Sequence, residues 1–360
     1  MIQTTLLTLA LAACTPPPPP APPRADVTLQ GAGATFPAPL YHRLVAEYQK
    51  LHPDVKIDYQ SIGSGGGVKA ITDSTVDFGA SDAPLSKKDL EKCGADNIVQ
   101  IPTCAGAVVP AYNLPGVTAE LKFTGEILAD VYLGKLTKWN DPRLVALNPE
   151  AALPDLAITP AWRTDGSGTT YVWTNYLTLQ CVPFKESIGA GKEVKWPVGQ
   201  GGKGNEGVTA VIQTTKGSLG YIELNYALEN KIAFGSVRNK AGKFVKATPD
   251  SVAKAVAAAA GQMKAPLLSA NTLDQEGDET YPVSSLTYLI VYKDLKSVKS
   301  REQAQELVNF LWWATHDGQK FTSKLNYAPL APAVQKQVEE ALAGVTFKGA
   351  SVKSLSYLPK

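Results

Sequence analysis

The segment Arg163–Thr170, which reads RTDGSGTT, combines the residue types of an anion-binding turn. It follows the apolar residues 157–160 and opens the aromatic run 171–176, so the pattern predicts a strand, a Gly-rich turn and a helix start. The first N–H groups of a helix lack intrahelical acceptors and carry the positive end of the helix dipole. A guanidinium such as that of Arg163 can bind a carboxylate or phosphate through two parallel hydrogen bonds. The segment therefore predicts an anion site, although a capped turn with a solvated Arg163 fits the same residues.

Two further Gly-rich turns lie earlier in the chain. Residues 31–37 read GAGATFP and residues 63–69 read GSGGGVK, and each turn precedes a helical pattern. Three such turns in one chain predict helix N-termini that converge on a single anion. Thr35 and Ser64 would then add hydroxyl donors, although both residue types are also common helix N-caps.

The strand-like segments beside these turns predict the element that positions them. Segments 55–61 and 76–82 alternate with helical patterns, and this rhythm is typical of a parallel sheet covered by helices. Ligands of such sheets bind at the carboxyl ends of the strands. Thr35, Ser64 and Asp82 each follow a predicted strand end, although Asp82 could also cap the helix that comes next.

Two apolar segments predict crossings between two domains. Residues 98–113 lead out of the first domain, and residues 286–292 form a buried strand that can lead back. A domain built from both ends of the chain around an inserted domain is the layout of a hinge-closing binding protein.

Composition and motifs argue against nucleic-acid and nucleotide binding. The net charge of +2 is close to zero, so no nucleic-acid partner is expected. Residues 199–204 are rich in glycine, but Lys203 lacks the following Ser or Thr of a P-loop and the glycine spacing differs. We expect a surface loop there, followed by a helix over residues 205–214.

The N-terminal segment has the pattern of a bacterial lipoprotein signal. Residues 1–14 form an apolar stretch that ends in Leu-Ala-Ala-Cys, which predicts lipidation of Cys14, although the usual N-terminal Lys or Arg is absent. Residues 15–25 are rich in proline and predict a semi-rigid tether that holds the protein off a membrane surface.

The other cysteines are Cys93, Cys104 and Cys181. Cys93 and Cys104 are separated by ten residues and flank a strand-like segment, so we predict a disulfide between them. No CxxC motif occurs and none of the three histidines is grouped with a cysteine, so no metal site is expected.

Six motifs resemble, in order, those of the periplasmic phosphate-binding proteins of the phosphate-specific ABC transporter, the PstS family. They are GAGATFPAP, GSGGGVKAI, TVDFGASDAPLS, YLGKLTKWND, RTDGSGTT and KWPVGQGGKGNEG, and the likeness runs from Thr28 to Leu342. The resemblance implies an α/β, two-lobed periplasmic binding protein of type II-like architecture, with two hinge crossovers. Residues 26–112 and 281–360 would form lobe 1, and residues 113–280 the inserted lobe 2.

The resemblance also implies a set of phosphate ligands. They are Thr35, Phe36, Ser64, Asp82, Arg163, Asp165, Ser167, Gly168 and Thr169. Asp82 would accept a hydrogen bond from the proton of the ligand, and Asp165 would steady Arg163, although an Asx turn explains Asp165 nearly as well. The others would donate from hydroxyl, guanidinium or backbone N–H groups.

The implied function is that of a monomeric receptor, without cofactor or catalysis, which delivers inorganic phosphate to a membrane permease and its ATPase. A receptor for another tetrahedral oxyanion, such as sulfate, is the alternative, and Asp82 separates the two because sulfate carries no proton near neutral pH. A phosphoester hydrolase with Ser64 or Ser167 as nucleophile is disfavoured, because no motif ties a histidine to either serine.

Overall fold

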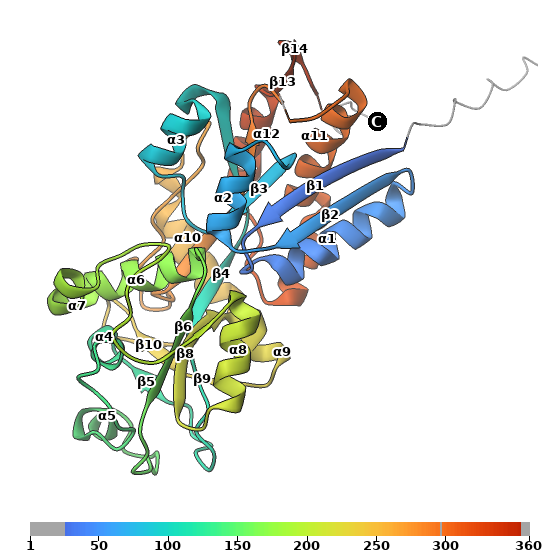
Figure 1. The fold of residues 1–360 in the computed structure, drawn as a ribbon. Coiled ribbons are helices and arrows are strands. Elements are labelled where there is room, and N and C mark those ends of the chain that lie inside the picture. The colour runs from blue at the N-terminus through green and yellow to red at the C-terminus, as the bar shows by residue number, and fades with distance from the viewer. Residues whose placement is uncertain (1–25, 296, 354–360) are drawn as a thin grey trace, which may run out of the picture.

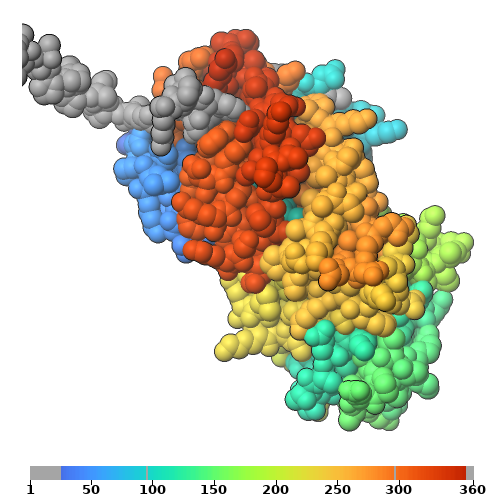
Figure 2. Space-filling model, turned by 180° about the vertical axis from the view of Figure 1, so that it is seen from behind, coloured from blue at the N-terminus to red at the C-terminus, as the bar shows by residue number. Residues whose placement is uncertain are grey.

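The protein has two lobes, which lie one above the other in Figure 1. The computed structural model describes residues 26–295 and 297–353. Seen from behind in Figure 2, the beginning and the end of the chain pack together in one lobe, and the middle of the chain builds the other. The predicted signal segment, the lipidation site Cys14 and the Pro-rich tether lie outside the described residues.

The first lobe is built on a mixed sheet. Its spatial order is β2 (Val55–Ser61), β1 (Val27–Gly33), β3 (Phe78–Ser81) and β12 (Ser284–Tyr292). Strands β1, β2 and β3 are parallel, as the strand and helix rhythm predicts, whereas β12 runs antiparallel to β3. The arrowheads of β1 and β2 point toward the second lobe, so the loops after these strands face it (Figure 1).

Strand β4 (Ile98–Tyr112) joins the two lobes, and all of its 15 residues are buried. It pairs antiparallel with β12 up to Ala107 and with β8 (Ser218–Glu223) from Val108 onward. The sheet continues to β6 (Thr159–Arg163) and the edge strand β7 (Gln200–Gly202), so the surface loop predicted there is wrong in part. A strand covered on both faces reads as a near-continuous apolar run, which is why the crossing is visible in the sequence.

Helices cover the sheets of both lobes. In the first lobe they are α1 (Ala38–Leu51), α2 (Ser64–Thr72), α3 (Lys87–Cys93), α11 (Arg301–Thr315) and α12 (Pro332–Ala343). In the second lobe they are α4 (Gly125–Tyr132), α5 (Pro142–Leu147), α6 (Gly168–Gln180), α7 (Val182–Ser187), α8 (Gly204–Thr214) and α9 (Leu224–Glu229). Helix α10 (Pro249–Ala259) packs on β4 and β12, where the lobes join.

Short elements complete the fold. The minor strands are β5 (Lys122–Phe123), β9 (Ala233–Phe234), β10 (Ser236–Arg238), β11 (Phe244–Val245), β13 (Thr346–Phe347) and β14 (Ala350–Ser351). Single 3-10 turns span Ala95–Asn97, Ala260–Gln262, Asp317–Phe321 and Ser323–Leu325.

Buried aromatic rings fix the strand end that carries Arg163. Trp173 of α6 stacks on Tyr221 of β8 with ring centroids 5.4 Å apart, and both residues are fully buried. The Tyr221 hydroxyl accepts a hydrogen bond from the Arg163 N–H at 3.1 Å and lies 2.7 Å from the Thr170 hydroxyl. The end of β6 and the start of α6 are therefore both tied to β8.

The predicted disulfide between Cys93 and Cys104 is wrong, because both thiols are free. Cys93 ends α3 and packs in a small apolar cluster with Ile98, whereas Cys104 lies in β4 inside the main core. Since a strand rises about 3.3 Å per residue, Cys104 lies about 20 Å beyond Ile98. A disulfide needs a Cα separation of about 4.4–6.8 Å.

The predicted helix caps also need correction. Helix α1 has Pro37 at its N-cap position, so Thr35 lies before the helix. Helix α2 begins at Ser64 itself rather than after it. Helix α3 is capped by Ser86, which excludes the alternative role of Asp82 as its cap.

We expect all three described cysteines to react as thiols. After denaturation without reductant, iodoacetamide should modify Cys93, Cys104 and Cys181, because each is free in the folded protein. Peptide mass spectrometry measures this directly, with a sample reduced before labelling as the control. A Cys93–Cys104 linked peptide in the unreduced sample would contradict the structure.

Candidate functional site

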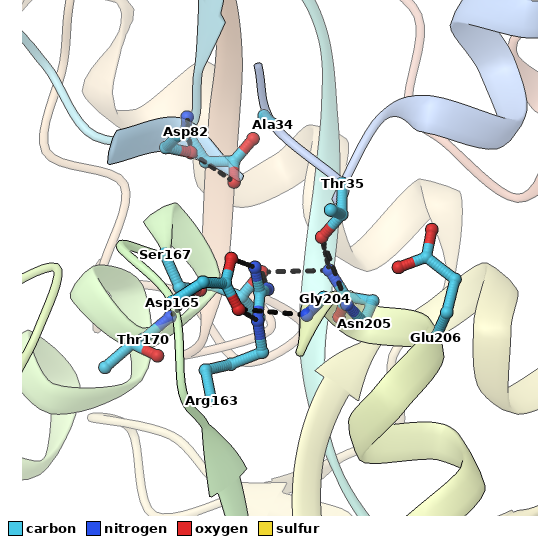
Figure 3. Close-up of polar contacts among 12 residues, drawn as sticks. Ala34, Thr35, Asp82, Arg163, Asp165, Ser167, Thr170, Gly204, Asn205 and Glu206 are labelled. Carbon is cyan, nitrogen blue, oxygen red and sulfur yellow. Dashed lines mark hydrogen bonds and ion pairs between the residues drawn. The ribbon is translucent and has the colours of Figure 1, made fainter. Parts of the chain in front are cut away.

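Polar side chains from both lobes meet where the strands of the two sheets end (Figure 3). The first lobe supplies Thr35, Ser64 and Asp82, and the second supplies Arg163, Asp165, Ser167, Gly168 and Thr169. All of them are buried except Asp165, whose side chain is 14% exposed. The structure therefore brings these residues of the sequence prediction together.

Phe36 places its side chain in the hydrophobic core rather than among these polar groups. Its side chain is fully buried in the core of the first lobe, with its ring centroid 6.3 Å from that of Tyr327. The Phe36 carbonyl accepts a hydrogen bond from the Tyr327 hydroxyl at 2.7 Å. The Tyr327 hydroxyl thereby holds the loop after β1 from the side of the core.

Two glycines allow the lobes to approach closely at the site. Gly63 has a φ of +87°, and a Cβ there would lie 2.3 Å from Asp165 Oδ2. A Cβ on Gly168 would lie 2.4 Å from Asp82 Oδ2 and 2.5 Å from Ser64 Oγ. A side chain at Gly168 would therefore collide with polar groups of the other lobe, and the start of α6 lies directly against them.

Arg163 is held by a forked ion pair. Its Nε donates to Asp165 Oδ1 at 2.9 Å and its Nη2 to Asp165 Oδ2 at 2.5 Å. Burial alone would raise the pKa of Asp165, but the Arg163 guanidinium together with the backbone N–H of Gly204 outweighs burial, and the pKa lies below its usual value. Nη1 points to Thr169 Oγ1 at 3.4 Å. Asp165 therefore orients Arg163, a role that an Asx turn alone would not provide.

Asp82 places a buried carboxyl group opposite these donors. Its Oδ1 accepts a hydrogen bond from the Thr287 hydroxyl at 2.8 Å, and its Oδ2 accepts one from the Ser64 hydroxyl at 3.2 Å. Burial raises the pKa of Asp82 to about 7, although Thr287, Arg163 and Ser64 each lower it. Asp82 therefore changes charge near neutral pH.

The N-terminus of α6 adds backbone donors. Ser167 is the N-cap, and its hydroxyl oxygen accepts a hydrogen bond from the Thr170 N–H at 2.9 Å. The next N–H groups, of Gly168 and Thr169, begin a 13-residue helix whose dipole makes this end positive. The site thus combines a guanidinium, hydroxyl groups and a helix N-terminus, which together suit an anion.

Asn205, which the sequence prediction missed, bridges the two lobes. Its Nδ2 donates to Thr35 Oγ1 at 2.8 Å and to Thr169 Oγ1 at 3.1 Å, and its backbone N–H also donates to Thr35 Oγ1. Because both hydroxyl oxygens act as acceptors here, their hydrogens remain for a ligand. The start of α8 after a Gly-rich loop is the sequence signal that could have identified Asn205.

Further contacts hold the lobes in a closed arrangement. The Gly65 N–H donates to the Gly166 carbonyl at 2.7 Å. The Tyr226 hydroxyl of α9 donates to the Thr35 carbonyl at 2.7 Å. At the edge of the cleft Lys192 lies 3.4 Å from Asp89. The site is therefore enclosed by backbone and side-chain contacts from both lobes.

Neither a metal centre nor a membrane span is found within the part of the chain that the structure describes. These residues contain no group of three or more His, Cys, Asp or Glu side chains that could hold a metal ion. No described helix is both long and apolar enough to cross a bilayer.

Comparison with known proteins identifies the family. The PBP superfamily domain matches residues 18–316. A protein of Pasteurella multocida, named phosphate-binding protein PstS, is 43% identical over 87% of this chain and 89% of its own length. A protein of Xylella fastidiosa with the same name is 40% identical over 88% of this chain and 86% of its own length. The chain belongs to the PstS family of phosphate-binding proteins. The family prediction is therefore confirmed.

The PstS fold is also found among solved structures. A phosphate-binding protein from Stenotrophomonas maltophilia superposes with a TM-score of 0.69 at 18% identity, covering 92% of this chain and all of the other. At this identity the likeness concerns the fold alone, and it confirms the predicted two-lobed α/β architecture. The PstS relatives are named as binding proteins rather than as enzymes.

Loss of the Asp165 carboxylate is expected to destabilise the empty protein. The Asp165→Ala variant leaves the Arg163 guanidinium, whose side chain is only 1% exposed, without its charged partner. Removal of one partner of a buried pair costs about 3–5 kcal/mol. Urea unfolding followed by circular dichroism, without added anions, measures the loss of free energy.

The matched control is Asp155→Ala. Asp155 pairs with Lys138, and the two side chains are 65% and 57% exposed, so this variant should cost less than about 1 kcal/mol. Equal effects of the two variants would show that the Arg163–Asp165 pair is not held as described.

Proposed function

We propose that this chain is a receptor that captures inorganic phosphate between its two lobes. The observation that carries the proposal is one carboxyl group, Asp82, buried against a set of anion donors from the opposite lobe. Donors alone would suit any oxyanion. A carboxylate among them suits an anion that still carries a proton.

The donors to the phosphate oxygens would come from both lobes. Arg163 and the N–H groups at the start of α6 would supply most of the positive charge from the second lobe. The hydroxyl groups of Ser64, Ser167 and Thr169 would add directed donors, as would Thr35 and the backbone of Phe36. Asp165 would act through Arg163 rather than on the ligand.

Asp82 would separate phosphate from sulfate. Phosphate near neutral pH carries at least one proton, so an ionised Asp82 can accept an O–H···O hydrogen bond from it. Sulfate has none, and its oxygen would face the carboxylate with both charges out of water. A site built to pair a ligand hydroxyl rejects an analogue without one by about 10⁴ to 10⁵.

The lobes would move about their crossings during capture. We assign residues 26–112 and 281–360 to lobe 1 and residues 113–280 to lobe 2, with β4 as one crossing. In the closed arrangement the hydrogen bond from Asn205 to Thr35 joins the two parts directly.

The proposed receptor would act alone, as a monomer without a cofactor, at the outer side of a membrane. It would deliver phosphate to the permease and ATPase subunits of an ABC transporter. Lipid on Cys14 and the tether of residues 15–25 would hold it at the membrane. The family relationship and the N-terminal sequence pattern support these assignments.

A hydrolase with a serine–histidine pair is not proposed, because its nucleophilic serine needs a histidine beside it as the base. In the described part of the chain, His42 lies near Tyr59, His52 stacks on Tyr48, and His316 pairs with Glu339. None of these contacts is with Ser64 or Ser167.

Calorimetric titration with phosphate and sulfate tests the function. A protein of residues 26–360, freed of bound anion, should bind one phosphate tightly and give no sulfate heat about one pH unit above the Asp82 pKa, where the carboxylate is largely ionised. The Asp82→Asn variant should bind the two anions within about tenfold of each other, because an amide can donate to either.

Asp77→Asn is the matched control, since Asp77 is a buried carboxyl group of the same lobe that pairs with Gln30 and Gln303 instead. It should keep the selectivity of the wild type. The proposed function would be refuted if the wild-type protein gave no binding heat with phosphate, or if it bound sulfate as tightly as phosphate.

A further inference from the structure

We propose that Thr287 is a positioning residue that sets the anion selectivity of the site by occupying one oxygen of Asp82. The inference rests on the proposed phosphate-binding function. Thr287 lies in the middle of the buried strand β12, where no sequence motif marks it. Its hydrogen bonds are with Asp82 and Thr103 of lobe 1 and not with the donors of the second lobe.

The fold places Thr287 against Asp82 with little freedom. Strand β12 runs antiparallel to β3, with Tyr288 opposite Ser81, so Thr287 lies opposite the residue that follows β3. That residue is Asp82. Its Oδ1 lies 2.8 Å from the Thr287 hydroxyl, and Thr287 is fully buried.

A second hydrogen bond anchors Thr287 from the other side. The Thr103 hydroxyl of β4 donates to the Thr287 carbonyl at 3.3 Å, and Tyr41 of α1 lies 2.7 Å from Thr103 Oγ1. Since the only hydroxyl hydrogen of Thr103 is used on the carbonyl, Tyr41 is the donor in the second bond. The position of Thr287 is thus fixed by three elements of lobe 1.

The bond from Thr287 makes the two Asp82 oxygens unequal. A threonine hydroxyl has one hydrogen, and this one is directed at Oδ1, so Oδ1 must be an acceptor. Oδ2 lies on the side of Ser64 and of Gly168 at the start of α6. Oδ2 is therefore the oxygen better placed to share a proton with a ligand.

The same bond favours the ionised carboxylate. Burial raises the pKa of Asp82, and Thr287 is the strongest of the groups that lower it again, ahead of Arg163 and Ser64. Without Thr287, more Asp82 would be neutral near neutral pH. A neutral carboxyl group donates a hydrogen bond from Oδ2, and such a donor can bind an oxygen of sulfate as readily as one of phosphate.

Arg163 is the charged group that faces Asp82 among its described titratable neighbours. The others are buried groups whose pKa values burial raises: Tyr41 of α1, Tyr59 of β2, Cys104 of β4, Glu223 of β8 and Tyr288 of β12. The Thr287 hydroxyl donates to Asp82, so its loss acts directly on this carboxyl group.

The test is calorimetric titration with sulfate and with phosphate over a range of pH, using the protein of residues 26–360 freed of bound anion. Wild-type sulfate affinity should fall as Asp82 ionises. In Thr287→Val, which removes the hydroxyl at nearly constant volume, that fall should move up by about one pH unit, so sulfate should bind about tenfold more tightly at pH values well above the Asp82 pKa of either protein. Phosphate affinity should change less.

Thr287→Ser keeps the hydroxyl and should restore the wild-type profile. Thr315→Val, which removes a fully buried hydroxyl of α11 that bonds Leu311, is the control for the loss of any buried threonine hydroxyl, and it should not alter the profile. If the valine variant does not fold, Thr287→Cys offers a weaker donor and should give a smaller shift in the same direction.

An unchanged sulfate profile in Thr287→Val, or a serine variant that behaves like valine, would overturn the role of Thr287 while leaving the proposed function intact. A wild type that does not bind phosphate would overturn the proposed function and this inference with it.

Discussion

A buried carboxyl group that faces an anion site between the two lobes is the constraint on which the rest of this structure depends. Removing Asp82 from water is costly unless the ionised group finds donors, and the raised pKa shows that the available donors offset this cost only in part. The ligand itself can complete the compensation if it brings a proton. The surrounding elements each contribute to this site. Loops at the strand ends carry the polar side chains, glycines let the two lobes approach closely, and Arg163 with the start of α6 supplies positive potential.

The long strand β4 explains how two lobes can act on one small ion. It pairs with β12 in the first lobe and with β8 in the second, so the strands that position Asp82 and Arg163 share one continuous sheet path. Hinge motion about such a crossing can separate the two halves of the site while each half keeps its own geometry. Within lobe 2 the Arg163–Asp165 pair and the Tyr221 hydroxyl hold their arrangement without help from lobe 1.

Local sequence patterns made much of the site predictable. Residues whose partners are distant in the sequence could not be predicted in this way. Ser64, Asp82 and Arg163 each adjoin a strand end and a small-residue turn, so neighbouring residues reveal them. Asn205 and Thr287 were missed because their partners are distant in sequence, 170 residues for Asn205 with Thr35 and 205 residues for Thr287 with Asp82. The disulfide was predicted wrongly for a related reason, since the spacing of two cysteines does not disclose that an unbroken 15-residue strand carries one of them away from the other. The identity of the ligand was predicted from the family motifs, because hydrophobic periodicity alone does not indicate a ligand.

The most direct test of the central claim is an atomic-resolution crystal structure of the phosphate complex. We expect a phosphate oxygen about 2.5–2.7 Å from Asp82 Oδ2, the distance of a charge-assisted O–H···O bond, with Thr287 still on Oδ1 and Arg163 and the start of α6 on the other oxygens. A phosphate bound elsewhere, or one whose oxygens avoid Asp82, would contradict it.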